Sequence, residues 1–323
     1  MTFIRGNDEI MINQTFPRPI TCLANQTRVG APLNLLLAVA LLFCSLPLAA
    51  DIELPQADGT VLVLPHPAQS IITLAPNLAE LVYAAGSGDR LIATVEYSDY
   101  PQAAARLPRV GDAFRLDLEQ ILSLKPDLVI AWDSGNPHAA IARLRALDVA
   151  TWSIEIHEPA DIASVLEQIG QATGKPEAAR EAAEQIRLEL AELQQQYAGA
   201  TAVSYFYQVA ASPLYTINGQ HLVSRGFALC GGTNVFQDAA MLAPQVSYEA
   251  VIAADPQVLL ASASPGEENS LTRWLDWPRM RAVRKGALFT LPADEISRAT
   301  PRTLDALAEG CRLLNESRTA SGR

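Results

Sequence analysis

The sequence predicts an α/β protein of two lobes with mainly parallel sheets, joined by one long rigid α-helix. Three observations lead to this fold class: strand and helix patterns alternate from residue 70 onward, the alternation restarts after residue 201, and a long helical stretch lies between. Such alternation favours parallel sheets with helices on both faces. We expect an N-terminal lobe over 51–174, a linker helix over 175–200 and a C-terminal lobe over 201–323.

The composition agrees with a folded two-domain chain. Its 323 residues are 49% hydrophobic and 18% charged, which suffices for two buried cores. The net charge of -11 repels phosphate backbones, so we expect no nucleic-acid partner.

The first fifty residues have the layout of a secretory signal peptide. The apolar run Leu35–Phe43 is shorter than the roughly 20 residues that span a membrane. A small pair ends at Ala50, so cleavage there leaves Asp51 as the mature N-terminus. Met11 is an alternative start, because no acidic residue separates it from the apolar run, and lipidation at Cys44 is an alternative fate.

Cysteine usage agrees with export, because Cys22 and Cys44 leave with the leader and Cys230 and Cys311 remain. An even pair in an oxidising compartment predicts a disulfide, and the alternative is two separate buried thiols. The bridge would close a loop of 81 residues. A loop of that length contributes about 4 to 5 kcal/mol in the chain-entropy model.

The first predicted lobe contains four apolar strand patterns separated by helical patterns. Gly86 ends the first helix. The predicted strands are 70–75, 90–97, 126–132 and 149–156, and the predicted helices are 77–86, 117–125 and 138–147.

The second lobe restarts with the strand pattern AVSYFYQV at 202–209. It continues with a helix at 248–255, strands at 257–262 and 286–292, and a closing helix from 301 to about 314.

The linker begins at Pro176, which suits a first helical turn, and runs to Tyr197 without a glycine or a second proline. A helix of that length spans about 33 Å. We interpret it as a stiff brace between the lobes; the alternative is an ordinary surface helix of one lobe.

One segment of the sequence is repeated. The stretches DLEQILSLKPDLVIAW and SYEAVIAADPQVLLAS lie 130 positions apart, and each places a helix-capping residue, Asp117 or Ser247, two positions before a glutamate. A carboxylate in a first turn is stabilised by the helix dipole, which alone explains Glu119 or Glu249. The alternative is that the two glutamates present matched acidic groups to a symmetric partner.

Five motifs in order resemble those of the periplasmic cobalamin-binding proteins of ABC importers. The resemblance covers about 70–314 and implies two lobes joined by one helix, with the ligand between them. The motifs are EYSDYP (96–101), LKPDLVIAW (124–132), CGGTNVF (230–236), PQVSYE (244–249) and SRATPR (297–302).

The resemblance also implies roles for single residues. It joins Cys230 to Cys311, and it docks Glu119 and Glu249 on a permease dimer of the inner membrane. It implies a monomeric periplasmic receptor that carries cobalamin or another corrinoid as transported ligand, with no catalysis and no intrinsic cofactor. The ligand contacts map onto Pro76, Asn77, Tyr97, Phe114, Trp132, Tyr215, Asp294 and Arg298.

These contacts offer flat apolar walls and a few polar groups, as a macrocycle with amide arms requires. Without the resemblance, Trp132 is interpreted equally well as a core residue or as a ligand contact. Asp294 and Arg298, taken alone, are better interpreted as an ion pair on the surface. The chain has Phe114 and Ala243 where the family often has tryptophan. A related corrinoid, a haem or a ferric siderophore is therefore the alternative ligand.

An exported metal-binding protein or metalloenzyme is the competing class. The chain has no Gly-x-Ser-x-Gly elbow, Walker loop or His-Glu-x-x-His motif, and GSGDRL lacks the third glycine of a dinucleotide fingerprint. Asp133, His138 and His157 are the candidate ligands, and zinc in the purified protein would support this class.

Overall fold

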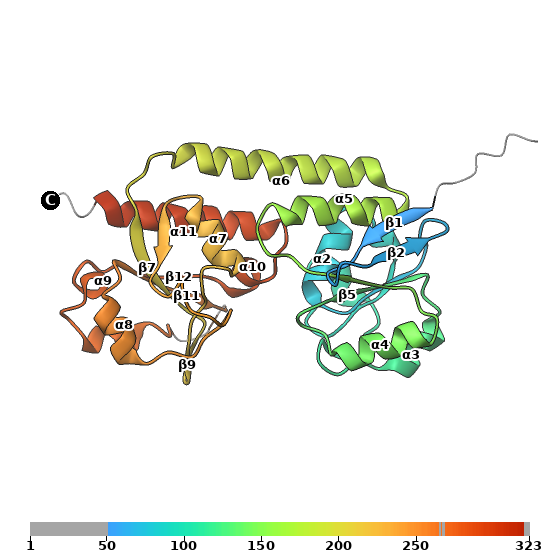
Figure 1. The fold of residues 1–323 in the computed structure, drawn as a ribbon, viewed down its shortest axis with the longest axis horizontal. Coiled ribbons are helices and arrows are strands. Elements are labelled where there is room, and N and C mark those ends of the chain that lie inside the picture. Colours follow the sequence, from blue (N-terminus) through green and yellow to red (C-terminus); the bar gives the residue numbers. More distant parts are fainter. Residues whose placement is uncertain (1–50, 265, 267–268, 320–323) are drawn as a thin grey trace, which may run out of the picture. The chain divides into compact units, whose positions relative to one another are not determined.

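Two four-stranded parallel sheets form the framework of the protein (Figure 1). The computed structural model describes residues 51–264, 266 and 269–319, so the predicted leader, the Met11 start and the Cys44 site lie outside the described residues. The N-terminal sheet has the order β4-β3-β5-β6 and the C-terminal sheet the order β10-β7-β11-β12. Counted within each lobe, both orders are 2-1-3-4, and the predicted fold class is confirmed.

The strands of the first sheet are β3 (Ile71–Thr73), β4 (Leu91–Ala93), β5 (Leu128–Trp132) and β6 (Thr151–Ile154). Those of the second are β7 (Val203–Gln208), β10 (Gly232–Asn234), β11 (Val258–Ala263) and β12 (Leu288–Pro292). Two antiparallel ribbons accompany them, β1 (Ile52–Pro55) with β2 (Val61–Leu64), and β8 (Ala210–Ala211) with β9 (Leu214–Tyr215).

Helices surround both sheets. In the N-terminal half they are α2 (Pro76–Ala84), α3 (Leu118–Leu124), α4 (His138–Ala146) and α5 (Asp161–Thr173), with 3-10 turns at Gly88–Arg90 and Ala104–Arg106. In the C-terminal half they are α7 (Leu222–Ala228), α8 (Tyr248–Ala254), α9 (Arg281–Arg284), α10 (Ala293–Ser297) and α11 (Arg302–Thr319), with a 3-10 turn at Thr272–Asp276. No helix in the described part of the chain is both long and apolar enough to cross a membrane.

The central strands explain why each sheet is covered on both faces. In β5, Leu128 and Ile130 pack into one core while Val129 and Ala131 pack into another. Successive strand residues point to opposite faces, so an apolar run of this kind needs helices on both sides.

The long helix α6 (Pro176–Gln196) contributes to the cores of both lobes. Its residues Ala179, Ala183 and Ile186 pack with the N-terminal core, whereas Leu193 and the C-cap residue Tyr197 pack with the C-terminal core. This spacing keeps the apolar side chains on one stripe of the helix. The apolar stripe of α6 therefore connects the two cores, as expected of a brace between the lobes. The lobe boundaries at 174 and 200 stay predictions.

The repeated sequence forms a repeated structure. Asp117 accepts a hydrogen bond from the backbone N–H of Gln120 at 2.9 Å, and Ser247 accepts one from Ala250 at 3.2 Å. Each helix then ends in a left-handed residue, Lys125 or Asp255, before its strand begins. Cap, helix, left-handed stop and central strand all recur 130 positions later.

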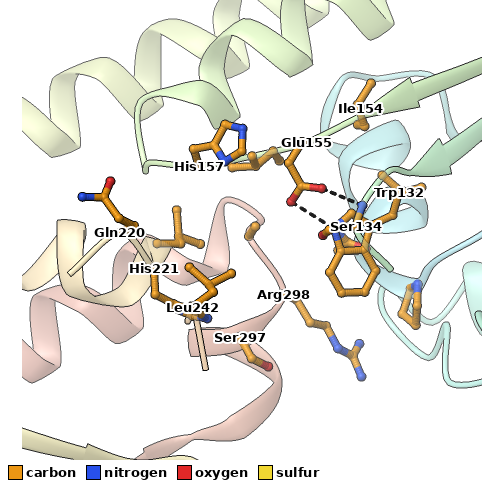
Figure 2. Close-up of a pocket in the computed structure, with 16 residues that line it drawn as sticks. Trp132, Ser134, Ile154, Glu155, His157, Gln220, His221, Leu242, Ser297 and Arg298 are labelled. Atoms are coloured by element: carbon orange, nitrogen blue, oxygen red, sulfur yellow. Dashed lines mark hydrogen bonds between the residues drawn. The ribbon is translucent and has the colours of Figure 1, made fainter. Parts of the chain in front are cut away.

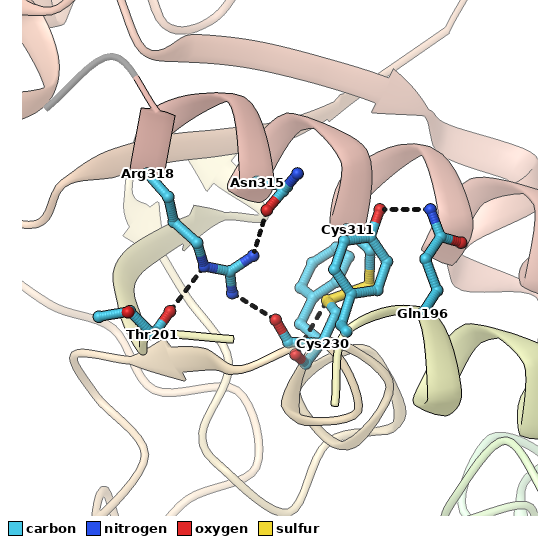
Figure 3. The surroundings of a disulfide bond; sticks show 8 residues. Gln196, Thr201, Cys230, Cys311, Asn315 and Arg318 are labelled. Carbon is cyan, nitrogen blue, oxygen red and sulfur yellow. Dashed lines mark hydrogen bonds between the residues drawn. A yellow bond between two sulfur atoms is a disulfide. The ribbon is translucent and has the colours of Figure 1, made fainter. Parts of the chain in front are cut away.

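The predicted disulfide between Cys230 and Cys311 is confirmed (Figure 3). It ties the end of the α7 segment to α11 within the C-terminal core. Beside it, the Arg318 guanidinium donates to the backbone carbonyls of Thr201 and Cys230.

One predicted strand is shorter in the structure, and several elements were not predicted. Strand β4 ends at Ala93 rather than at Tyr97, because the backbone of Thr94 and Glu96 forms hydrogen bonds with the 108–111 segment. Tyr97 itself has a left-handed backbone, with φ of 65°, which a strand does not accommodate. The sequence patterns also missed α5 and the β1–β2 ribbon in the N-terminal half, and β8, β9, α7, β10, α9 and α10 in the C-terminal half. Gly170 of α5 lies so close to α6 that a Cβ there would be 2.3 Å from that of Ala179.

Candidate functional site: a cavity lined by both lobes

A cavity of about 380 Å³ is lined by sixteen residues from both lobes (Figure 2). Many of them follow the carboxyl ends of sheet strands, where open parallel sheets usually bind ligands. The lining residues are Pro76, Asn77, Leu78, Trp132, Ser134, Ile154, Glu155, Ile156, His157, Gln220, His221, Leu222, Leu242, Ser297, Arg298 and Ala299.

Trp132 provides a flat aromatic surface at the end of β5. Its indole N–H donates to Glu155 Oε1 at 3.2 Å, and the backbone N–H of Ser134 donates to Glu155 Oε2 at 2.8 Å (Figure 2). One carboxylate therefore fixes both the ring and the turn that follows it. A buried donor with a partner holds a single orientation, which makes the ring a preformed wall.

Gly135 and Asn136, which follow Ser134, explain how the Trp132 ring is accommodated. A Cβ at Gly135 would lie 1.9 Å from the Trp132 ring, so any larger residue would displace the indole. Asn136 is buried, and its side-chain oxygen accepts from the Trp132 backbone N–H at 2.8 Å. Its Nδ2 donates to the carbonyls of Leu74 and Ala113, which joins three loops near the cavity.

His221 supplies a polar group from the C-terminal lobe. Its Nδ1 accepts from the backbone N–H of Val223 at 3.2 Å, and burial lowers the pKa of the imidazole. A neutral ring whose Nδ1 is an acceptor carries its proton on Nε2. His221 therefore offers a hydrogen-bond donor, which suits a carbonyl oxygen of a ligand.

Arg298 is the only arginine or lysine among the lining residues, and its side chain is 12% exposed. Its Nη1 donates to Glu80 Oε1 at 3.0 Å and to Asp99 Oδ1 at 2.8 Å, both from the N-terminal lobe. Its Nη2 lies 2.8 Å from Asp294 Oδ1. The guanidinium thus bridges the lobes and carries three carboxylate partners.

Arg302 strengthens the same bridge from the first turn of α11. Its Nη2 and Nε donate to the two oxygens of Glu80, at 2.8 and 3.0 Å, and its guanidinium lies 4.0 Å from the centroid of the Tyr100 ring. The motifs EYSDYP and SRATPR, far apart in sequence, therefore meet across the interlobe boundary.

Four of the eight predicted ligand contacts line the cavity: Pro76, Asn77, Trp132 and Arg298. The other four lie outside its lining, and contact of the ligand with them stays a prediction. Asp294 pairs with Arg298, and Tyr215 lies in β9. Tyr97 and Phe114 are 77% and 71% exposed, which is unusual for large aromatic side chains.

Sequence reasoning missed several residues of the site. Glu155, Gln220, His221 and Leu242 belong to no motif, because their roles depend on contacts between distant segments. One local signal was available: the Gly135-Asn136 pair, which begins three positions after the strand-ending Trp132, marks a tight turn.

The candidate metal ligands do not form a site. The described residues contain no group of three or more His, Cys, Asp or Glu side chains placed to hold a metal ion. Asp133, His138 and His157 are therefore not brought together, although His157 lines the cavity.

The two repeated glutamates are exposed. Glu119 lies in the first turn of α3 and Glu249 in the first turn of α8, and neither forms an ion pair with another described residue. Hydrogen bonds from its own backbone N–H and from the Ser247 side chain lower the pKa of Glu249. Helices α3 and α8 lie on the side of the sheets away from α6 (Figure 1).

Comparison with known proteins defines the class. The family model for periplasmic binding proteins matches residues 71–295, and the chain belongs to that family. A vitamin B12-binding protein of Vibrio cholerae is 40% identical over 256 residues, which is 79% of this chain and 92% of the relative.

Solved structures agree with this relationship. The periplasmic vitamin B12 binding protein BtuF of Vibrio cholerae matches with a TM-score of 0.73 and 39% identity, over 80% of this chain and 99% of that one. The periplasmic heme-binding protein RhuT of Roseiflexus sp. RS-1 matches with a TM-score of 0.66 and 25% identity, over 77% and 99%.

Proposed function

We propose that this protein is a periplasmic receptor that binds cobalamin or a related corrinoid in the interlobe cavity and delivers it to an ABC transporter. The relationship to vitamin B12-binding proteins supports the ligand class. In this proposal the chain is a binding protein without catalytic activity and without an intrinsic cofactor.

The observation that carries the proposal is the fixed Trp132 wall, facing polar groups of the other lobe in one cavity. A corrin ring is a flat apolar macrocycle with amide arms, so it needs a flat surface for the ring and hydrogen-bonding groups for the arms. The His221 donor and the Gln220 amide suit such arms. The exposed rings of Tyr97 and Phe114 are proposed to cover further parts of the ligand.

A receptor for haem or a ferric siderophore is the second candidate. The likeness to a heme-binding protein at 25% identity is the observation behind it. Identity to the vitamin B12-binding relative is higher, at 40%, which favours the corrinoid.

The same proposal includes export and docking. The signal-peptide layout of the first fifty residues supports export to the periplasm, where we propose that the receptor acts as a monomer. Glu119 and Glu249, exposed on equivalent helices, are proposed to dock on the two permease subunits of the transporter.

Titration calorimetry of residues 51–323 against cobalamin, cobinamide, haem and a ferric siderophore tests this function. We expect one-to-one binding of the two corrinoids, at least about tenfold tighter than haem or the siderophore, a difference of about 1.4 kcal/mol. Tighter binding of haem would replace the corrinoid by the second candidate, and zinc retained through purification would support the metal-binding class instead.

A further inference from the structure

The cation that lines the cavity is surrounded by an excess of acidic groups. Arg298 faces the carboxylates of Glu80, Asp99 and Asp294, while Arg302 faces Glu80 and Glu295. Two guanidinium groups therefore share four carboxylates. A fifth carboxylate, that of Glu155, also lines the cavity and is held by Trp132 and Ser134.

We propose that Glu80, Asp99 and Asp294 form a neutralising carboxylate cage around Arg298, which makes the cavity select uncharged, amide-armed corrinoids over tetrapyrroles that carry free carboxylates. The inference rests on the proposed corrinoid function and specifies which members of that ligand class are accepted. We attribute this preference for amide-armed ligands to the neutralisation of Arg298, which lines the cavity.

Hydrogen bonds from the two arginines hold the carboxylates of this cage in place. Glu80 is 3% exposed and receives hydrogen bonds from both arginines. Burial opposes the ionisation of Asp99, but the hydrogen bond and the charge of Arg298 outweigh it and lower the pKa of Asp99. Buried charges are tolerated when they are paired in this way, and a paired cation has little attraction left for another anion.

The cage still leaves Arg298 able to recognise a neutral ligand. A guanidinium has five N–H donors in a fixed plane, and the three carboxylates do not use all of them. A remaining N–H is free to donate to the carbonyl of an amide arm. A carboxylate at the same place would meet the acidic groups around Arg298, and like-charge juxtaposition disfavours wrong partners strongly.

The test compares the affinities of cyanocobalamin and its monocarboxylic acid, in which one amide arm is hydrolysed. Wild-type protein should bind the amide form at least about tenfold more tightly, which corresponds to about 1.4 kcal/mol. Asp99→Asn, Asp294→Asn and the double variant remove charge while keeping an amide oxygen at each place. Both aspartates are more than half exposed, so these variants are suited to folding normally.

The quantity compared is the affinity for cyanocobalamin divided by the affinity for its monocarboxylic acid. We expect this ratio to fall by about tenfold in the double variant, because the carboxylate form should gain affinity while the amide form does not. Glu309→Gln is the matched control, since Glu309 pairs with Arg312 on α11 and does not line the cavity. Its affinity ratio should equal that of the wild type.

The possible failures are distinguishable. If the wild-type protein binds both corrinoids equally, or if the double variant weakens both by the same factor, the cage has no role in selectivity and the inference is wrong while the corrinoid function stands. If the wild-type protein binds neither corrinoid, the proposed function itself fails and the inference fails with it.

Discussion

Trp132 shows how a single side chain is prepared for a ligand. Its ring is oriented by Glu155, its backbone N–H is bonded to Asn136, and its face is kept clear by Gly135. Three neighbours thus fix the position of one aromatic ring. Such preorganisation reduces the ordering cost of binding.

Replacing Trp132 with alanine should weaken cobalamin binding by about thirtyfold, or about 2 kcal/mol, because an aromatic anchor of the cavity is lost. Titration calorimetry measures the change, and circular dichroism checks the fold. Trp277→Ala is the matched control, since Trp277 stacks on Tyr248 outside the cavity lining and its loss should leave affinity unchanged. Unchanged affinity in a folded Trp132→Ala protein would remove this residue from the site.

His221 should make stability depend on pH. Its folded pKa is lowered by burial, so the unfolded chain takes up the proton first when the pH falls. The stability that neutral His221 supplies is present above about pH 6.5, its unfolded pKa, and is lost as the pH falls below that value.

His221→Asn preserves an acceptor for the Val223 N–H but does not titrate. Urea unfolding at pH 7.5 and pH 5.5 should therefore show a smaller loss of stability in this variant than in wild type. Equal losses in the two proteins would mean that the imidazole does not contribute to the acid sensitivity.

At the scale of elements, the sequence was most informative where local signals and packing agree. The α3–β5 and α8–β11 units were predicted from capping residues, apolar periodicity and the 130-residue repeat, and the structure confirms both. Capping and periodicity are properties of neighbouring residues, so they are readable without the fold.

Other elements and most of the missed site residues depend on distant partners. The β1–β2 ribbon has exposed valines at 61 and 63 and no strong periodicity. Strand β4 stops early because the backbone after Ala93 forms hydrogen bonds with the distant 108–111 segment. Glu80 lies within a predicted helix, and no local signal marks it, because its partners Arg298 and Arg302 lie more than 200 positions away. Pairings of this kind are set by tertiary structure alone.

Removal of the disulfide should destabilise the C-terminal lobe. The double change Cys230→Ser and Cys311→Ser opens an 81-residue loop in the unfolded chain. The chain-entropy model gives a loss of about 4 to 5 kcal/mol. Urea unfolding of the oxidised wild type and the double variant measures it. A loss below about 1 kcal/mol would show that the bridge contributes little to stability.

At the scale of the whole molecule, the two lobes share one strand order, one repeated unit and one brace. Equivalent helices carry Glu119 and Glu249, so each lobe presents the same group in the same setting. A two-fold pair of permease subunits is a partner that matches such a duplicated surface.

Reversing both charges, with Glu119→Lys and Glu249→Lys together, should strongly reduce uptake while ligand affinity is kept. The glutamates are exposed and lie outside the cavity lining, and exposed charges orient partners more than they stabilise folds. Uptake in cells with this receptor as sole supplier is the measurement, beside calorimetry on the purified variant.

The matched control is Glu181→Lys with Glu192→Lys, two exposed carboxylates of α6, which should leave uptake normal. Full uptake with the Glu119→Lys and Glu249→Lys variant would contradict the docking role. The two glutamates would then only stabilise the starts of their helices.

The proposed function requires that a corrinoid binds in the cavity between the lobes. Hydrogen–deuterium exchange of residues 51–323 with and without cobalamin tests it most directly. We predict slower exchange in segments of both lobes that line the cavity, at 76–78, 132–136, 154–157, 220–222 and 297–299. Unchanged exchange in all of them at saturating cobalamin, or protection confined to one lobe, would contradict binding in this cavity.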